Sequence, residues 1–198
     1  MRDFNMTEDQ WNASSDATAM LEFVLNRKGI TSDSTQHAMG YRMNSGAVKD
    51  AGDFETQLHR FYVACCQSIW KLLPDSSSRN GIDIAEKWLD GTASDSELNQ
   101  CNWTSEGAAF GIDYKTAPDQ LEDWILKVDA IPKNELKLIL APSVDLQKIN
   151  SYDLLKRAAY FANFVTRYSA MSPNGLPRRS YHIFLSAQIL RQHLKYAP

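Results

Sequence analysis

Residues 54–73 carry the feature that most restricts how this chain can fold. Their apolar side chains recur at spacings of three and four positions: Leu58, Phe61, Cys65, Ile69 and Leu72. That spacing places the side chains on one face of an α-helix, because a helix turns once every 3.6 residues or so, about 100° per residue. Pro74 ends the helix, since proline lacks the backbone N–H that a helix interior needs. The segment therefore predicts a long helix with one buried face.

Several other segments show helical spacing between recognisable start and stop residues. Asp16 can cap a helix that Gly29 ends, and Gly91 stands where a helix starting near Asp75 should finish. The remaining predicted helices begin at Ser94 or Asp95, or cover 119–130, 151–171 and about 180–195. Residues 107–118 indicate a connection, and 136–140 fit either a short helix or a buried strand.

The pattern as a whole predicts an all-α fold. We expect a compact bundle of about six or seven helices forming a single domain over residues 1–198. Residues 29–53 are rich in Gly, Ser, Asn and Asp and lack periodic apolar residues, so they predict one long loop or insertion. A loop of that length in a compact domain is usually functional or mobile.

Composition favours a cytoplasmic globular protein. Hydrophobic residues make up 43% and charged residues 23%, which excludes wholesale disorder. No apolar run reaches the roughly 18–20 residues that cross a bilayer, and the first residues lack the pattern of a signal peptide, so we expect no membrane association. Three cysteines without regular spacing predict reduced thiols.

The charge is distributed unevenly along the chain. Residues 1–132 hold 11 Lys or Arg against 21 Asp or Glu, whereas residues 133–198 hold 10 against 3. A basic end can bind phosphates or an acidic partner. Opposite charges at the two ends can also attract each other within the fold, and this intramolecular interpretation is the one we favour.

Two motifs resemble an uncharacterised family of bacterial helical domains. One is the N-terminal Thr7-Glu8-x-x-Trp11, and the other is the block from Leu58 to Leu73 with its Cys-Cys-x-x-x-Trp core. The chain departs from the family pattern at Val63, where a further cysteine is common, and at positions 67 and 68, where arginines are common. The family has no established activity, so the resemblance implies a helical fold and no particular function.

Histidine and cysteine raise the question of a metal site. His59 and Cys66 are seven residues apart on one predicted helix and share a face, and Cys101, His37 or Cys65 could complete a tetrahedral zinc site. The spacing matches no zinc signature. Buried thiols and a hydrogen-bonded histidine account better for these residues, so we expect neither a metal nor another cofactor.

Catalytic motifs are missing from the sequence. There is no Gly-x-Ser-x-Gly elbow, no glycine-rich phosphate loop, and the four histidines are scattered. An enzyme is therefore not favoured. A metal-dependent enzyme in which His59 and Cys66 converge with another ligand is the second alternative to the function proposed below.

Aromatic and basic residues expected at the surface indicate a binding function. Trp103 lies in polar surroundings and predicts an interaction surface, whereas the other four tryptophans fit a helical core. We expect a non-enzymatic module that binds another protein or assembles with its own copies. The first alternative is nucleic-acid binding through the basic C-terminal residues, with these as candidate contacts: Arg178, Arg179, Arg191 and Lys195.

Overall fold

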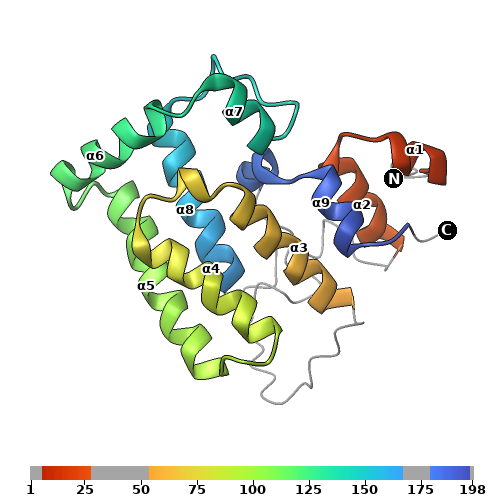
Figure 1. Ribbon diagram of the computed structural model, residues 1–198, viewed down its shortest axis with the longest axis horizontal. Coiled ribbons are helices and arrows are strands. Elements are labelled where there is room, and N and C mark those ends of the chain that lie inside the picture. The colour runs from red at the N-terminus through yellow and green to blue at the C-terminus, as the bar shows by residue number, and fades with distance from the viewer. Residues whose placement is uncertain (1–5, 28–53, 167–178, 197–198) are drawn as a thin grey trace.

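The protein is built from helices, as the computed structural model in Figure 1 shows for residues 6–27, 54–166 and 179–196. Within these residues there are nine α-helices and two short 3-10 helices, η2 (Trp70–Leu72) and η4 (Arg179–Phe184), and no strand. The α-helices are α1 (Glu8–Ala13), α2 (Ala17–Arg27), α3 (Phe54–Ser68), α4 (Ser76–Leu89), α5 (Asp95–Asp113), α6 (Pro118–Asp129), α7 (Lys133–Ile139), α8 (Ser151–Thr166) and α9 (Ala187–His193). The all-α prediction is confirmed. The number of α-helices exceeds the predicted six or seven because short capped segments form separate helices.

Helix α3 follows the prediction for residues 54–73 closely. Its apolar face is buried, with Phe61 and Cys65 removed from solvent, and Ile69 directly after the helix is buried as well. The α-helix ends at Ser68 and continues as η2, after which Pro74 stops the helical hydrogen bonding. The predicted loop at 29–53 lies outside the described residues.

Helices α4, α5 and α8 pack against one another more extensively than any other elements, and Figure 1 shows α4 and α5 side by side along the lower left of the molecule. Gly81 makes this close approach possible. A Cβ atom at position 81 would lie 2.8 Å from the Thr166 methyl carbon and 3.4 Å from the Ser105 Cβ. A glycine is therefore required where α4 meets both of its neighbours.

Helix α5 extends further than the sequence pattern indicated. Ser94 caps it by accepting a hydrogen bond from the Glu97 backbone N–H, while the Glu97 carboxylate accepts one from the Ser94 N–H (2.7 Å). The prediction of a connection from residue 107 was wrong, because the helix runs to Asp113. Its last two turns persist because Ala109 and Ile112 are buried against neighbouring helices, which compensates for the two glycines in this stretch.

The C-terminal part contains two short helices where one was predicted. Residues 179–184 form η4, and Ser186 caps the separate helix α9 by accepting a hydrogen bond from the Ile189 backbone N–H (3.3 Å). The ambiguity over residues 136–140 is resolved as helix, since 133–139 form α7. Helices α7 and α9 each pack against the core with a buried leucine, Leu136 in α7 and Leu190 in α9.

The two ends of the described chain lie together. Tyr196 donates a hydrogen bond to the Met6 carbonyl (3.0 Å), and its ring stacks on that of Phe23 at 5.6 Å between centroids. Trp11 packs against both rings. In Figure 1 these segments form the right-hand side of the molecule, with α9 beside α2. Among the described helices, none is long and apolar enough to span a bilayer.

The contact at Gly81 gives a prediction with an internal control at Gly107, where a Cβ would meet nothing within 4 Å. Gly107→Ala should raise the free energy of unfolding by about 0.5–1 kcal/mol, because alanine favours a helix over glycine. Gly81→Ala should lower it, since an overpacking cost of about 1–3 kcal/mol outweighs that gain. Urea denaturation of the two variants measures the difference. Equal stabilisation of both would show that α4 does not need the glycine.

Candidate functional site

Among the described residues, the most exposed large aromatic side chains lie on α5 and at its C-cap, Tyr114. Trp103 is 70% exposed, Tyr114 is 73% exposed and Phe110, between them in sequence, is 43% exposed. Soluble proteins rarely leave several large aromatic rings in water on one helix without a use for them. We call these three side chains the α5 aromatic face.

Helix geometry places the three rings in one line. Their positions differ by seven and four residues, so their directions around the helix axis fall within about 40° of one another. The line extends about 16 Å along the axis. Gly107 lies between Trp103 and Phe110 with open space where its side chain would be. The face is therefore a row of aromatic rings with a gap in the middle.

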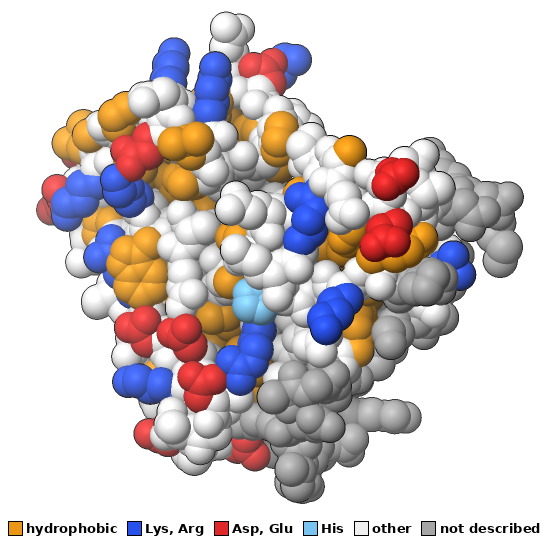
Figure 2. All heavy atoms as spheres, turned by 45° about the vertical axis from the view of Figure 1, so that its right-hand side comes forward, with side chains coloured by type: hydrophobic (Ala, Val, Ile, Leu, Met, Phe, Trp, Pro, Cys, Tyr) orange, Lys and Arg blue, Asp and Glu red, His pale blue; other side chains and the backbone are white. Residues whose placement is uncertain are grey.

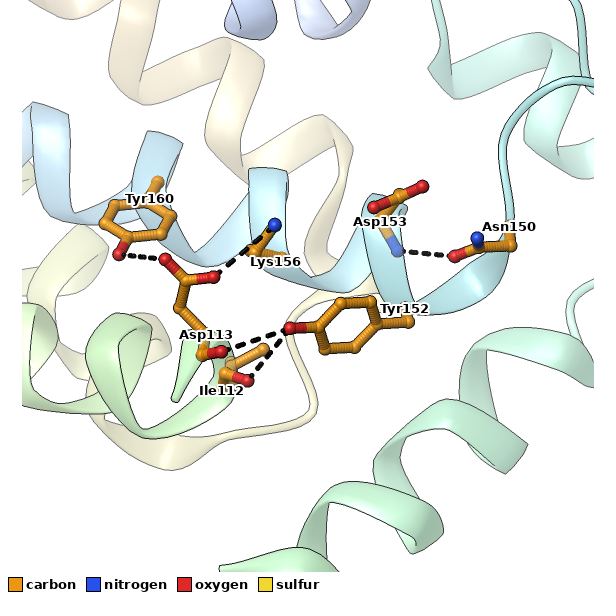
Figure 3. Close-up of polar contacts among 7 residues, drawn as sticks. All are labelled: Ile112, Asp113, Asn150, Tyr152, Asp153, Lys156 and Tyr160. Carbon is orange, nitrogen blue, oxygen red and sulfur yellow. Dashed lines mark hydrogen bonds and ion pairs between the residues drawn. The ribbon is translucent and has the colours of Figure 1, made fainter. Parts of the chain in front are cut away.

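A polar cluster fixes the C-terminal end of this face, as Figure 3 shows. The Tyr160 hydroxyl on α8 donates to Asp113 Oδ2 (2.9 Å), and the Lys156 Nζ lies 3.4 Å from Asp113 Oδ1. Burial, and then the hydrogen bond to Asp113, raise the pKa of Tyr160. The Tyr152 hydroxyl donates to the Asp113 carbonyl (3.2 Å). The last turn of α5 is thus tied to α8.

The same cluster orients the exposed rings. The Phe110 ring lies 6.1 Å from that of Tyr160 and 5.9 Å from that of Tyr114, and both pairs meet edge to face. Such pairs stabilise a fixed arrangement of the rings. Since Tyr160 is itself held by Asp113, Phe110 and Tyr114 rest on a rigid support, which reduces the entropy lost when a partner binds them.

The segment that contains α4 and α5 is acidic in composition. Residues 75–113, which include α4 and α5, hold eight Asp or Glu against two Lys or Arg. Two of the eight pair with bases: Asp90 lies 2.8 Å from Arg60 of α3, and Asp113 lies 3.4 Å from Lys156 of α8. Figure 2 shows several acidic side chains at the lower left of the molecule, with Lys or Arg side chains among them. An excess of acids over bases along α4 and α5 favours cations over anions near these helices.

A cavity of about 290 Å³ lies beside the aromatic face, between α4, α5 and α6. Its lining includes Asp75, Ser77, Gly107, Gly111, Thr116 and Trp124. We call it the α4–α6 cavity. Because Gly107 and Gly111 flank Phe110 on α5, the cavity adjoins the aromatic face.

The residues considered for zinc have separate environments. His59 Nε2 forms a hydrogen bond with the Val165 carbonyl (2.7 Å), and Cys66 lies 3.7 Å from the Phe161 carbonyl. Cys101 accepts a hydrogen bond from the Asn80 side chain (3.3 Å). Within the described part of the chain, no three His, Cys, Asp or Glu side chains are grouped as metal ligands would be. His37 lies outside it.

Burial keeps the thiols protonated. It raises the pKa of Cys65 to about 12, and it also raises the pKa values of Cys66 and Cys101. Since the thiolate is the nucleophile and the metal ligand, these cysteines are poorly suited to either role as they stand. All three are free.

The basic C-terminal residues do not form one described surface. The Arg191 guanidinium donates to the backbone carbonyls of Trp11 (2.8 Å) and Ser14, so it joins the C-terminal helix to the N-terminal segment. Lys195 is exposed. Arg178 and the side chain of Arg179 lie outside the described residues.

Comparisons of the chain with protein-family models, curated protein sequences and solved structures found no match. The resemblance to a bacterial helical family therefore stays a prediction.

Sequence reasoning found Trp103 and missed the other members of the site. Phe110 and Tyr114 were overlooked because residues 107–118 were interpreted as a connection, although their spacing from Trp103 already fitted one side of a helix. Asp75 was recognised only as a helix cap. Nothing in the sequence indicated that a cavity lies beside it.

Exposure of the aromatic face predicts that its members contribute little to stability. Trp103→Ala should change the free energy of unfolding by no more than about 0.5 kcal/mol, as is usual for exposed positions. Trp88→Ala is the matched comparison, because Trp88 is buried and donates to Asp95 (2.7 Å). It should cost about 3–5 kcal/mol. Chemical denaturation measures both, and a comparable loss in the two variants would assign Trp103 to the core.

Proposed function

We propose that this protein is a protein-interaction module that binds its partner through the α5 aromatic face. The observation that carries the proposal is the row of exposed rings formed by Trp103, Phe110 and Tyr114. Tryptophan and tyrosine dominate the energetics of protein interfaces, since they bury a large area while losing little conformational freedom.

The partner is a basic, amphipathic helical segment of another protein. A helix presents apolar side chains at spacings of three, four and seven, which match a row of rings about 16 Å long. Its basic residues complement the acidic excess of residues 75–113. This charge favours a cationic partner over the phosphates of a nucleic acid.

The C-terminal residues lend less support to nucleic-acid binding. Arg191 uses its guanidinium N–H groups for backbone carbonyls of the same chain, which leaves fewer of them for a phosphate. A second copy of this chain is the alternative partner for the aromatic face. Residues 133–198 are basic, so they could supply the positive charge that the proposed partner carries.

Selection from a displayed library of helical peptides tests the proposal. Enriched peptides should combine Lys or Arg with large apolar residues at helical spacing, and their binding should weaken with added salt. The variant Trp103→Ser/Tyr114→Ser should weaken binding by at least about tenfold, because it removes two central aromatic contacts. Fluorescence anisotropy with a labelled selected peptide gives the dissociation constants.

Leu138→Ser provides the control, since Leu138 is an exposed apolar residue on α7 and outside the aromatic face. It should bind the peptide as the unchanged protein does. Two results would overturn the proposal. One is the selection of peptides whose binding is insensitive to the double substitution, and the other is a dimer, seen by light scattering, that the double substitution dissociates.

A further inference from the structure

Asp75 is a buried carboxylate with only one oxygen engaged. Its side chain caps α4, where Oδ1 accepts a hydrogen bond from the Ser78 backbone N–H (2.6 Å). Oδ2 has no hydrogen-bond partner, although the residue is only 4% exposed. An acceptor removed from water without a partner is costly, and more so when it is charged.

The same residue lines the α4–α6 cavity. At about 290 Å³ this cavity falls just below the range of about 300–1,000 Å³ typical of sites for whole small molecules. It suits a single side chain better. Two glycines of α5, Gly107 and Gly111, form part of its lining and place no side chain in it.

No basic side chain in the described residues pairs with Asp75. The arginine one turn along α4, Arg79, is directed elsewhere: its guanidinium lies 5.5 Å from the centre of the Trp70 ring, and Nη2 is 3.4 Å from the Trp70 carbonyl. Trp124 is also among the residues that line the cavity. A carboxylate and an indole together are a favourable environment for an organic cation.

We infer that the α4–α6 cavity is a recognition pocket for a cationic side chain, lysine or arginine, with Asp75 Oδ2 as its acceptor and Trp124 as its aromatic wall. The source of this side chain is the basic segment that binds the adjoining α5 aromatic face, and on this point the inference rests on the proposed function. Engagement of Asp75 would select partners that carry a basic residue beside their apolar ones.

Blocked amino acids test the pocket without any partner. The probes are N-acetyl-arginine methylamide and N-acetyl-lysine methylamide, with the neutral isostere N-acetyl-citrulline methylamide as the comparison. The readout is the Trp124 indole N–H resonance in the full chain, assigned with Trp124→Phe. At least one cationic probe should shift it with a dissociation constant of about 1–10 mM, and citrulline should not.

Asp75→Asn removes the charge and keeps the helix cap, because asparagine caps a helix as well as aspartate does. It should weaken binding of the cationic probe by at least about tenfold. Asp83→Asn is the matched control, since Asp83 is an exposed acid on the same helix, and it should have no effect. Thermal unfolding checks that both variants fold.

Three results would overturn the inference: no shift at Trp124 with either cationic probe, equal shifts with citrulline, or the same binding in Asp75→Asn. If neither cationic probe shifts the Trp124 resonance, the cavity holds only ordered water. Trp103→Ser/Tyr114→Ser should bind the blocked amino acids like the unchanged protein, because its substitutions lie outside the cavity. Failure of the proposed docking face and failure of the pocket are therefore distinguishable.

Discussion

Gly81 brings α4 into contact with Ser105 of α5 and Thr166 of α8, and the rest of the arrangement is organised around that contact. Three helices that meet through small side chains leave little room between their axes. This packing buries the inner face of α5, which includes Ala109 and Ile112. The side of the helix bearing Trp103 and Tyr114 is left in water. The fold thereby presents an aromatic row on a rigid helix, where a docking surface gains most from pre-organisation.

Polar contacts reinforce the same geometry at the edges of the packed helices. Asp113 receives Tyr160 and Lys156 from α8, so an acid from the acidic part of the chain pairs with a base from the basic part. This contact agrees with the intramolecular interpretation of the uneven charge. Residues 75–113 nonetheless hold eight acids against two bases, and Asp75 retains an unpartnered oxygen. These two features favour a cationic partner and form the basis of the proposals above.

Much of the helical fold could be predicted from the sequence, because periodic apolar residues determine which face of a helix is buried. Helix α3, within the predicted residues 54–73, and helix α4, which ends at Leu89 shortly before Gly91, follow directly from this pattern. The end of α5 could not be predicted, since glycines at 107 and 111 lower local helix propensity and only tertiary contacts restore it. The split C-terminal helix depends on the Ser186 cap. For the site, polar neighbours indicated the exposure of Trp103, but the cavity at Asp75 depends on three helices meeting and leaves no local signal.

Photocrosslinking in the cells that produce the protein tests the central claim, that the α5 aromatic face is a docking surface. A photoreactive phenylalanine analogue is introduced in place of Trp103 or, as the control, in place of Leu138, which is 83% exposed on α7. If the α5 aromatic face is a docking surface, position 103 should give a discrete adduct to another protein and position 138 none, and the crosslinked peptide should carry a net positive charge. Equal adducts from both positions, or adducts only between copies of this chain, would contradict it.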